Sequence, residues 1–119
     1  MAANIDFAPT FMEIAGATPL REMDGRSLLP YFAGDSVPRD ILLENFPDPV
    51  VKGGGNVRAV RNASFMYAEH PSGERELYDL RIDPFQLNSV HDDSDYADEM
   101  AELATRLDQL RDCAGVGCR

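Results

Sequence analysis

The stretch that decides the fold runs from residue 57 to residue 80 and reads VRAVRNASFMYAEHPSGERELYDL. Its segments VRAVRN and SFMYAE fit the period-two alternation of β-strands, in which neighbouring side chains point to opposite faces of a sheet. Asn62-Ala63 can turn the chain between these segments, and Pro71-Ser72-Gly73 can turn it again before ELYDL. The pattern predicts an antiparallel meander in which each strand pairs with the next one along the chain.

Two further segments extend this meander. Residues 39–46, RDILLENF, have the composition of one more edge strand, which brings the sheet to about four strands within residues 39–82. After ELYDL, Asp83-Pro84 turns the chain. We expect Phe85 and Leu87, which follow this turn, to pack back onto the sheet.

A long C-terminal helix over residues 94–112 is predicted to cover one face of the sheet. Its apolar side chains recur at spacings of 4, 3, 4 and 3 residues, which places them on one stripe: Tyr96, Met100, Leu103, Leu107 and Leu110. Ser94 or Asp95 can cap the start of this helix. We therefore expect an α+β fold, with a small antiparallel sheet packed against the C-terminal helix. The 119 residues suffice for one such domain.

The sequence of residues 1–34 predicts two short helices before the sheet. Asp6 can cap the first helix, and Ser27 can cap the second, SLLPYF. Together the two helices carry more large apolar side chains than they and a small sheet can cover, namely Phe7, Phe11, Leu28, Leu29 and Phe32. Part of this surface is expected to face a partner.

The chain is strongly acidic, with a formal net charge of −10 and a pI near 4.4. Such a charge disfavours binding to nucleic acid or to anionic membranes, because the long-range field repels phosphates. No apolar run approaches the roughly 20 residues that span a bilayer, and MAANIDFAPT lacks the basic and apolar regions of a signal peptide. The acidic residues between 92 and 102 fit a solvated helix face better than a metal site, and they lack the EF-hand spacing.

Residues 47–56, PDPVVKGGGN, contain two prolines and three consecutive glycines. This composition predicts a loop between two strands. It is either a plain surface excursion or, because rigid strands often carry functional loops, a segment that contacts substrate. A phosphate-binding loop is disfavoured because the glycines precede a strand and not a helix.

The sequence ends in CAGVGCR, with Cys113 and Cys118 as its two cysteines. Four small residues separate them, so the two sulfurs can meet in a disulfide, which would indicate an oxidising compartment. A redox-active pair is the alternative, although such pairs more often read Cys-x-x-Cys. Two cysteines without a nearby histidine cannot form a closed zinc site.

No group of residues in this sequence has the pattern of an active site. His70 and His91 are its two histidines, and none of its serines stands in a Gly-x-Ser-x-Gly elbow. Several glutamates could pair across strands, but strand alternation on an exposed surface explains them equally well. We expect no catalytic residue and no metal ligand in this chain.

Several segments, taken in order, resemble the C-terminal part of type I sulfatases: NIDFAPTFMEIAGAT, MDGRSLLPYFAGD, RDILLENF, RAVRNASFMYAEHPSGERELYDLRIDPFQLNSV and RLDQLRDCAGVGCR. The resemblance runs from Asp6 to Arg119. The closing Cys-Ala-Gly-x-x-Cys-Arg is similar to the N-acetylglucosamine-6-sulfatase branch of the family.

The resemblance implies a C-terminal subdomain that packs beside a large N-terminal α/β sulfatase domain. In the family, a cysteine or serine within Cys/Ser-x-Pro-x-Arg becomes formylglycine, and a divalent cation, usually calcium, helps to hold the sulfate. The sequence contains neither form of this motif, so calcium and formylglycine are implied for the full-length enzyme and no cofactor for this part. The resemblance also implies an extracellular or periplasmic location.

In the whole enzyme, sulfated carbohydrate would lie against the glycine-rich loop, because this loop has a basic residue near each end that can recognise sulfate locally. We expect Glu44, Lys52 and Arg58, which flank or belong to the glycine-rich loop, to border the substrate cleft. Residues 1–34 would contact the large domain, so that the isolated chain could self-associate through their apolar face. Two alternatives remain: an autonomous acidic protein-binding module, and a free-standing enzyme with an unrecognised site.

Overall fold

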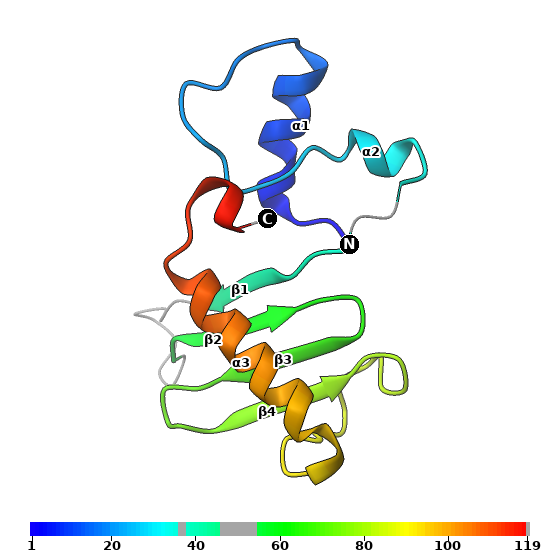
Figure 1. Ribbon diagram of the computed structural model, residues 1–119, viewed down its shortest axis with the longest axis vertical. Helices are drawn as coiled ribbons and strands as arrows, with labels where there is room; N and C mark the ends of the chain where they lie inside the picture. The colour runs from blue at the N-terminus through cyan, green and yellow to red at the C-terminus, as the bar shows by residue number, and fades with distance from the viewer. Residues whose placement is uncertain (36–37, 46–54, 119) are drawn as a thin grey trace.

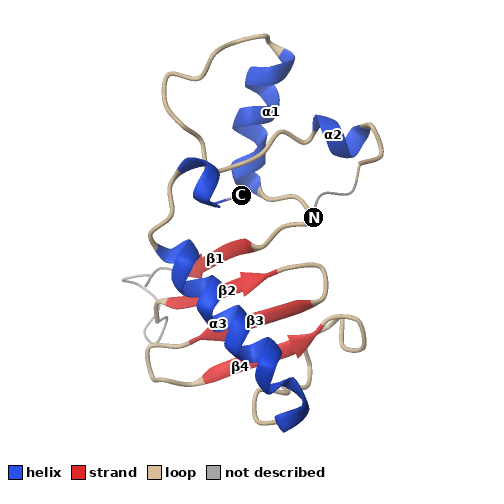
Figure 2. Cartoon of the chain, in the orientation of Figure 1, coloured by secondary structure: helices blue, strands red, loops and turns tan. Residues whose placement is uncertain are grey.

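The computed structural model describes residues 1–35, 38–45 and 55–118, and it has the predicted α+β architecture. A helix, α3 (Ala97–Arg111), crosses one face of a four-stranded sheet (Figures 1 and 2). All neighbouring strands are antiparallel and follow one another in chain order: β1 (Ile41–Asn45), β2 (Val57–Arg61), β3 (Phe65–Glu69) and β4 (Arg75–Asp79). The predicted meander and its helical cover are therefore confirmed.

Shorter helices flank this unit at both ends of the chain. The N-terminal helices lie beyond the β1 edge of the sheet, and the C-terminal turn lies between them and α3 (Figure 1). These elements are η1 (Asn4–Asp6), α1 (Phe7–Ile14), α2 (Leu29–Phe32), η2 (Ser94–Tyr96) and η3 (Gly115–Cys118). In the described part of the chain, no helix is long and apolar enough to span a bilayer.

The core is one row of side chains that crosses all four strands beneath α3. Strand register places Leu42 opposite Val60, Val60 opposite Tyr67, and Tyr67 opposite Leu77. The predicted apolar stripe of α3 packs onto this row through Leu103, Leu107 and Leu110. Because one row continues through every strand, a slip of one residue would expose the whole buried set.

The turn at Asn62 fixes the register of β2 and β3. Its side-chain Oδ1 accepts hydrogen bonds from the backbone N–H groups of Ser64 and Phe65, at 2.9 and 2.8 Å. This is the local side-chain-to-backbone bonding for which asparagine is favoured in turns. The turn predicted at Asn62-Ala63 is confirmed.

Phe85 and Leu87 do not pack onto the sheet, so that expectation was wrong. Their exposed fractions are 81% and 77%. The Oδ2 atom of Asp83 accepts hydrogen bonds from the backbone N–H groups of Leu87 and Asn88, both at 2.8 Å. Gln86 adopts a φ of 57°. This compact turn, built around Asp83, holds the two apolar side chains in solvent.

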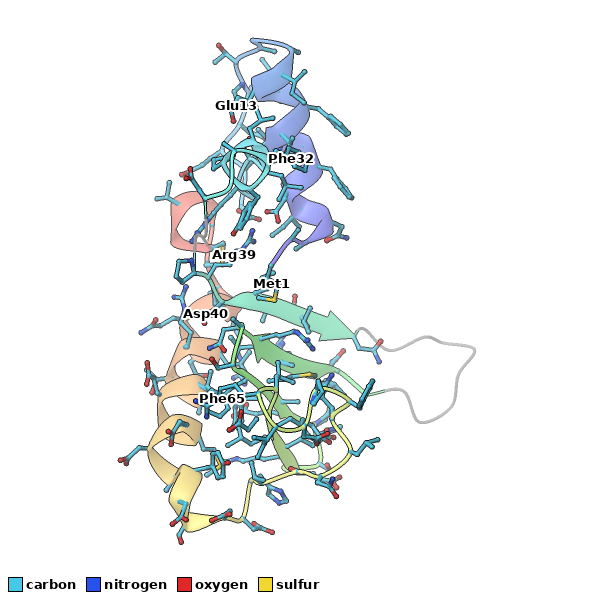
Figure 3. The ribbon with its side chains drawn as sticks, turned by 90° about the vertical axis from the view of Figure 1, so that its right-hand side faces the viewer. Met1, Glu13, Phe32, Arg39, Asp40 and Phe65 are labelled. Carbon is cyan, nitrogen blue, oxygen red and sulfur yellow. A yellow bond between two sulfur atoms is a disulfide. The ribbon has the colours of Figure 1, made fainter. Side chains whose placement is uncertain are left out.

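Asp6 stands at the N-cap position of α1 as expected, but its carboxylate does not cap that helix. It is fully buried, and both of its oxygens lie 2.8 Å from Nη1 of Arg39, which precedes β1. It also accepts hydrogen bonds from the backbone N–H groups of Ala3 and Arg26, at 2.7 and 2.9 Å. In Figure 3, Arg39 lies where the N-terminal helices meet the sheet.

Residues 1–34, which we call the N-terminal helical segment, share little apolar core with the sheet. The Cα radius of gyration is 16.2 Å, against about 13–14 Å for a compact domain of this length. The connection between the two parts therefore depends on polar contacts such as the Asp6–Arg39 ion pair.

We expect Leu107→Ala to lower the free energy of unfolding by about 2–5 kcal/mol, because it empties a fully buried position in the core. The matched control is Leu87→Ala, the same substitution at an exposed site, with an expected change of at most about 0.5 kcal/mol. Urea denaturation followed by circular dichroism measures both variants. Equal effects would contradict the core described above.

Candidate functional site

The structure brings two of the three predicted substrate-binding residues together. Glu44 of β1 is opposite Arg58 of β2 in the strand register. Nε of Arg58 donates a hydrogen bond to Oε1 of Glu44 at 3.1 Å, and the Arg58 side chain is 43% exposed. Lys52 lies outside the described residues. The ion pair therefore stands at the end of the strands that flank the glycine-rich loop.

Glu44 and Arg58 belong to a row of alternating charge across the sheet. Register pairs Arg58 with Glu69 and Glu69 with Arg75, so the sign alternates from β1 to β4. This charged row (Glu44, Arg58, Glu69 and Arg75) lies one step from the apolar row, on the same face, because strand side chains repeat every second residue. Opposite charges on neighbouring strands stabilise the pairing.

Glu69 forms its ion pair and its hydrogen bond with residues other than Arg58. It forms an ion pair with Arg111 in the last turn of α3, and its Oε1 accepts a hydrogen bond from Tyr67 Oη at 2.8 Å. Burial, together with this hydrogen bond, raises the pKa of Tyr67 to about 12. Tyr67 therefore stays a neutral donor near neutral pH, and Glu69 joins the helix to the sheet.

Arg58 consequently has Glu44 as its ion-pair partner and retains unused donors. Among the described residues, its two terminal guanidinium nitrogens have no hydrogen-bond partner. A guanidinium with a free edge can bind an anion such as a sulfate or carboxylate through two parallel hydrogen bonds. Glu44 offsets the charge of Arg58 but also holds its side chain in place.

A second polar cluster lies on the opposite face of the sheet. Nε2 of His70 is 2.6 Å from Oε1 of Glu76, and Tyr78 Oη donates a hydrogen bond to Oε2 at 2.7 Å. The hydrogen bond from Tyr78, with a smaller contribution from His70, lowers the pKa of Glu76, while Glu76 raises the pKa of Tyr78 to about 12. A glutamate held in its ionised form does not serve as a general acid at neutral pH.

Ser89, His91 and Asp92 form a chain of polar contacts that the sequence analysis did not identify. Ser89 Oγ lies 3.0 Å from His91 Nδ1, and His91 Nε2 lies 3.2 Å from Asp92 Oδ2. The Asp92 side chain is 92% exposed, and Ser89 Oγ also accepts a hydrogen bond from the backbone N–H of Leu77. Ser89 thus completes the hydrogen bonding of β4, and a solvated aspartate does not hold a histidine as a catalytic triad does.

A third cluster, around Asp79, fastens the start of α3 to β4. Arg81 donates to both oxygens of this buried carboxylate, at 2.8 and 2.6 Å, and Tyr96 Oη donates to Oδ2 at 3.3 Å. The hydrogen bonds from Arg81 lower the pKa of Asp79 to about 2. The Arg81 guanidinium also lies 4.7 Å from the centre of the Phe65 ring. This cluster has a structural role.

A groove of about 730 Å³ runs between α3 and the β2–β3 turn. Among its polar side chains, Asp40 accepts hydrogen bonds from Arg106 at 2.9 Å and from Asn62 at 3.3 Å. Asp40 therefore links α3 to the β2–β3 turn at this groove.

The family resemblance implies calcium and formylglycine for the full-length enzyme, and the described residues of this chain do not fit a site for either. Across residues 1–35, 38–45 and 55–118, no three His, Cys, Asp or Glu side chains are placed to hold a metal ion. The whole sequence also lacks the Cys/Ser-x-Pro-x-Arg motif.

The comparisons with known proteins agree with one another on the family that this chain resembles. The family model described as N-sulphoglucosamine sulphohydrolase, C-terminal, matches residues 1–113. The N-acetylglucosamine-6-sulfatase of Bos taurus is 31% identical over 100% of this chain and 27% of its own length. The N-acetylglucosamine-6-O-sulfatase of Bacteroides thetaiotaomicron is 26% identical over 93% of this chain and 21% of its own length.

A solved structure of an enzyme in complex with its substrate, D-glucosamine-2-N,6-O-disulfate, has the same architecture. It superposes with a TM-score of 0.75 and 25% identity, over 87% of this chain and 22% of that chain. The chain thus spans about a fifth to a quarter of the length of the relatives it matches.

We expect Asp79→Asn to destabilise the protein more at pH 6 than at pH 2. The folded-state pKa of Asp79, about 2, lies below its ordinary value of 3.8, so its contribution to stability is complete above about pH 4 and is lost as the pH falls through about 2. Urea denaturation at several pH values measures the difference in free energy of unfolding from the wild type.

The control for this series is Asp35→Asn at an exposed position, with an expected change of at most about 0.5 kcal/mol at either pH. A difference for Asp79→Asn that stays constant from pH 6 to pH 2 would refute the assigned role of the Arg81–Asp79 pair.

Proposed function

This chain belongs to the family of N-sulphoglucosamine sulphohydrolase C-terminal domains, and we propose that it completes a larger sulfatase that hydrolyses 6-O-sulfate esters of glucosamine-containing sugars. The match over residues 1–113 carries the assignment to a sulfatase, and the names of similar proteins support the 6-O position. The names of the two relatives and the substrate of the solved complex all place a sulfate on the 6-oxygen of a glucosamine.

The chemistry of ester hydrolysis would belong to the preceding domain. Formylglycine would supply the nucleophile there, and calcium would help to hold the sulfate, as the family resemblance implies. Within this proposal the present chain supplies substrate contacts and structural support, and no step of the reaction is assigned to it. The Cys113–Cys118 disulfide is compatible with an extracellular or periplasmic enzyme.

The proposed substrate contact is the end of the sheet at Glu44 and Arg58, together with Lys52 of the glycine-rich loop. The net charge of −10 disfavours long-range attraction of a sulfated sugar, so recognition would depend on short-range hydrogen bonds. The Glu44 carboxylate holds Arg58 by one edge and leaves its other donors for the ligand. Glu44 is thus a positioning residue in this proposal.

The proposed contact with the large domain is the apolar stripe of α1. Phe7, Phe11 and Ile14 recur at spacings of four and three residues and are 54%, 64% and 63% exposed. Phe32 of α2 is 77% exposed, and Figure 3 shows it among the N-terminal helices, away from the sheet. A face of this kind is typical of an interface with another domain.

We expect the isolated chain to self-associate through this stripe at high concentration. Sedimentation velocity over a concentration series should show a mass that rises with concentration, and Phe7→Ser/Phe11→Ser should abolish the rise. The matched control is Phe85→Ser, which removes a phenylalanine that is more exposed than either of these from the Asp83 turn. Association that persists in the Phe7/Phe11 variant would contradict the proposed interface.

The experiment that tests the proposed function uses the full-length enzyme and a 6-O-sulfated N-acetylglucosamine oligosaccharide. The wild type should release sulfate, and Lys52→Ala/Arg58→Ala should lower kcat/KM by roughly 10–100-fold, as expected for lost charge-assisted hydrogen bonds. Arg61→Ala is the control, because Arg61 lies on the same strand but faces the other side of the sheet.

Two results would separate the two parts of the proposal. A full-length wild type that is folded and fully converted to formylglycine, yet releases no sulfate, would disprove the assigned activity. An active wild type with an unchanged kcat/KM in the double variant would disprove only the assignment of Lys52 and Arg58.

A further inference from the structure

The loop closed by the Cys113–Cys118 disulfide binds two carboxylates from a distant part of the chain. The backbone N–H of Gly115 donates to Asp24 Oδ1 at 2.7 Å, and the backbone N–H of Val116 donates to Glu22 Oε1 at 3.1 Å. Consecutive backbone N–H groups that point to one side are a common anion-binding arrangement. Here the bound anions are side chains of the N-terminal helical segment.

Gly115 is suited to this contact for two separate reasons. Its φ of +59° lies in the left-handed region, which disfavours residues with a Cβ. A Cβ at this position would also lie 1.9 Å from Cδ of Glu22, so any other residue would displace that carboxylate. Gly117 in the same loop has no such constraint, because a Cβ there would lie 4.0 Å from Cys113 Cβ, an ordinary van der Waals contact.

Residues 22–26 are held on their other side by η1. The backbone N–H of Arg26 donates to the buried carboxylate of Asp6 at 2.9 Å. Gly25 packs so closely that a Cβ would lie 2.0 Å from the backbone oxygen of Ile5. Residues 22–26 therefore form a strap that lies between the first turn of the chain and the C-terminal loop.

From these contacts we propose that the disulfide-closed loop is a redox-sensitive clasp, which fastens the N-terminal helical segment to the end of α3. The disulfide holds residues 113–118 in the tight turn that directs the N–H groups of Gly115 and Val116 at the strap. Opening the disulfide removes this constraint, so the strap loses its C-terminal anchor. The core beneath α3 rests on Leu103, Leu107 and Leu110, which pack on the sheet before the loop begins, and Cys113 is only partly buried at its border.

Reduction by a dithiol opens the clasp in a balanced exchange. The S–S bond of the protein breaks, and the dithiol passes two electrons and two protons to Cys113 and Cys118, which become free thiols. The dithiol closes to its own cyclic disulfide. In a reducing compartment the clasp would stay open, so the N-terminal helical segment would be fully anchored only in an oxidising one.

The test is hydrogen–deuterium exchange of the complete chain, read by mass spectrometry for residues 3–34, for β2–β4 and for α3. Gly115→Ala keeps the disulfide but displaces Glu22, and it should speed exchange in residues 3–34 by about tenfold or more. Exchange in β2–β4 and in α3 should not change. Gly117→Ala is the matched control and should behave as the wild type.

Reduction of the folded wild type with a dithiol supplies an independent measurement that needs no mutation. It should reproduce the effect of Gly115→Ala on residues 3–34, and Glu22→Ala/Asp24→Ala, which removes both acceptors, should do so with the disulfide intact.

Unchanged exchange in residues 3–34 after complete reduction would overturn the proposal. It would also be overturned if β2–β4 exchanged faster to the same extent, because the disulfide would then support the core and not the clasp. If Gly117→Ala matched Gly115→Ala, general loosening of the loop would replace the specific contact with Glu22.

Discussion

The buried carboxylate of Asp6 is the constraint on which the arrangement of this chain depends. Burial alone would raise its pKa, but the hydrogen bonds from Arg39 and from the backbone N–H groups of Arg26 and Ala3 lower it, so the group stays ionised. Breaking one side of a buried ion pair typically costs about 3–5 kcal/mol, because the remaining charge is left without a partner. Through this one side chain, the first turn of the chain, the strap and the residue before β1 are held together.

Two kinds of interaction therefore hold the parts of the chain together. Beneath α3, one continuous apolar row joins all four strands, and its stability comes from removing that surface from water. Between the N-terminal helical segment and the sheet, carboxylates dominate: Asp6 meets Arg39, while Glu22 and Asp24 meet the disulfide-closed loop. Polar contacts of this kind fix geometry without covering apolar area, which is why the stripe of α1 remains exposed. A subdomain that packs against a larger domain needs such a surface.

In this acidic chain, opposite charges are paired on neighbouring strands of the sheet. In the charged row, Arg58 lies between Glu44 and Glu69, and Arg75 lies opposite Glu69, so the sheet gains stability without a strong field of one sign. Glu69 pairs with Arg111 and Tyr67, so within the described residues Arg58 is held by Glu44 through Nε. The proposed recognition of a sulfate ester depends on Glu69 pairing with residues other than Arg58. It would act at short range, where hydrogen-bond geometry matters more than net charge.

The sequence by itself determined the meander, the helix that covers it and the pairing of the two cysteines. Each of these depends on contacts that repeat along the chain or lie close within it: alternation in strands, a 3–4 spacing in α3, the turn at Asn62 and a loop of four residues between Cys113 and Cys118. It also placed Glu44 and Arg58 near one another, because they flank a single loop. Tertiary structure alone decided the burial of Asp6, its pairing with Arg39 and the binding of Glu22 and Asp24 by the C-terminal loop. Partners separated by 33 to 94 residues leave no periodic signal, and an acidic side chain near a helix start looks the same in sequence whether it caps that helix or turns inward. Likewise, the outward position of Phe85 and Leu87 follows from hydrogen bonds to Asp83, which the apolar character of the two side chains does not reveal.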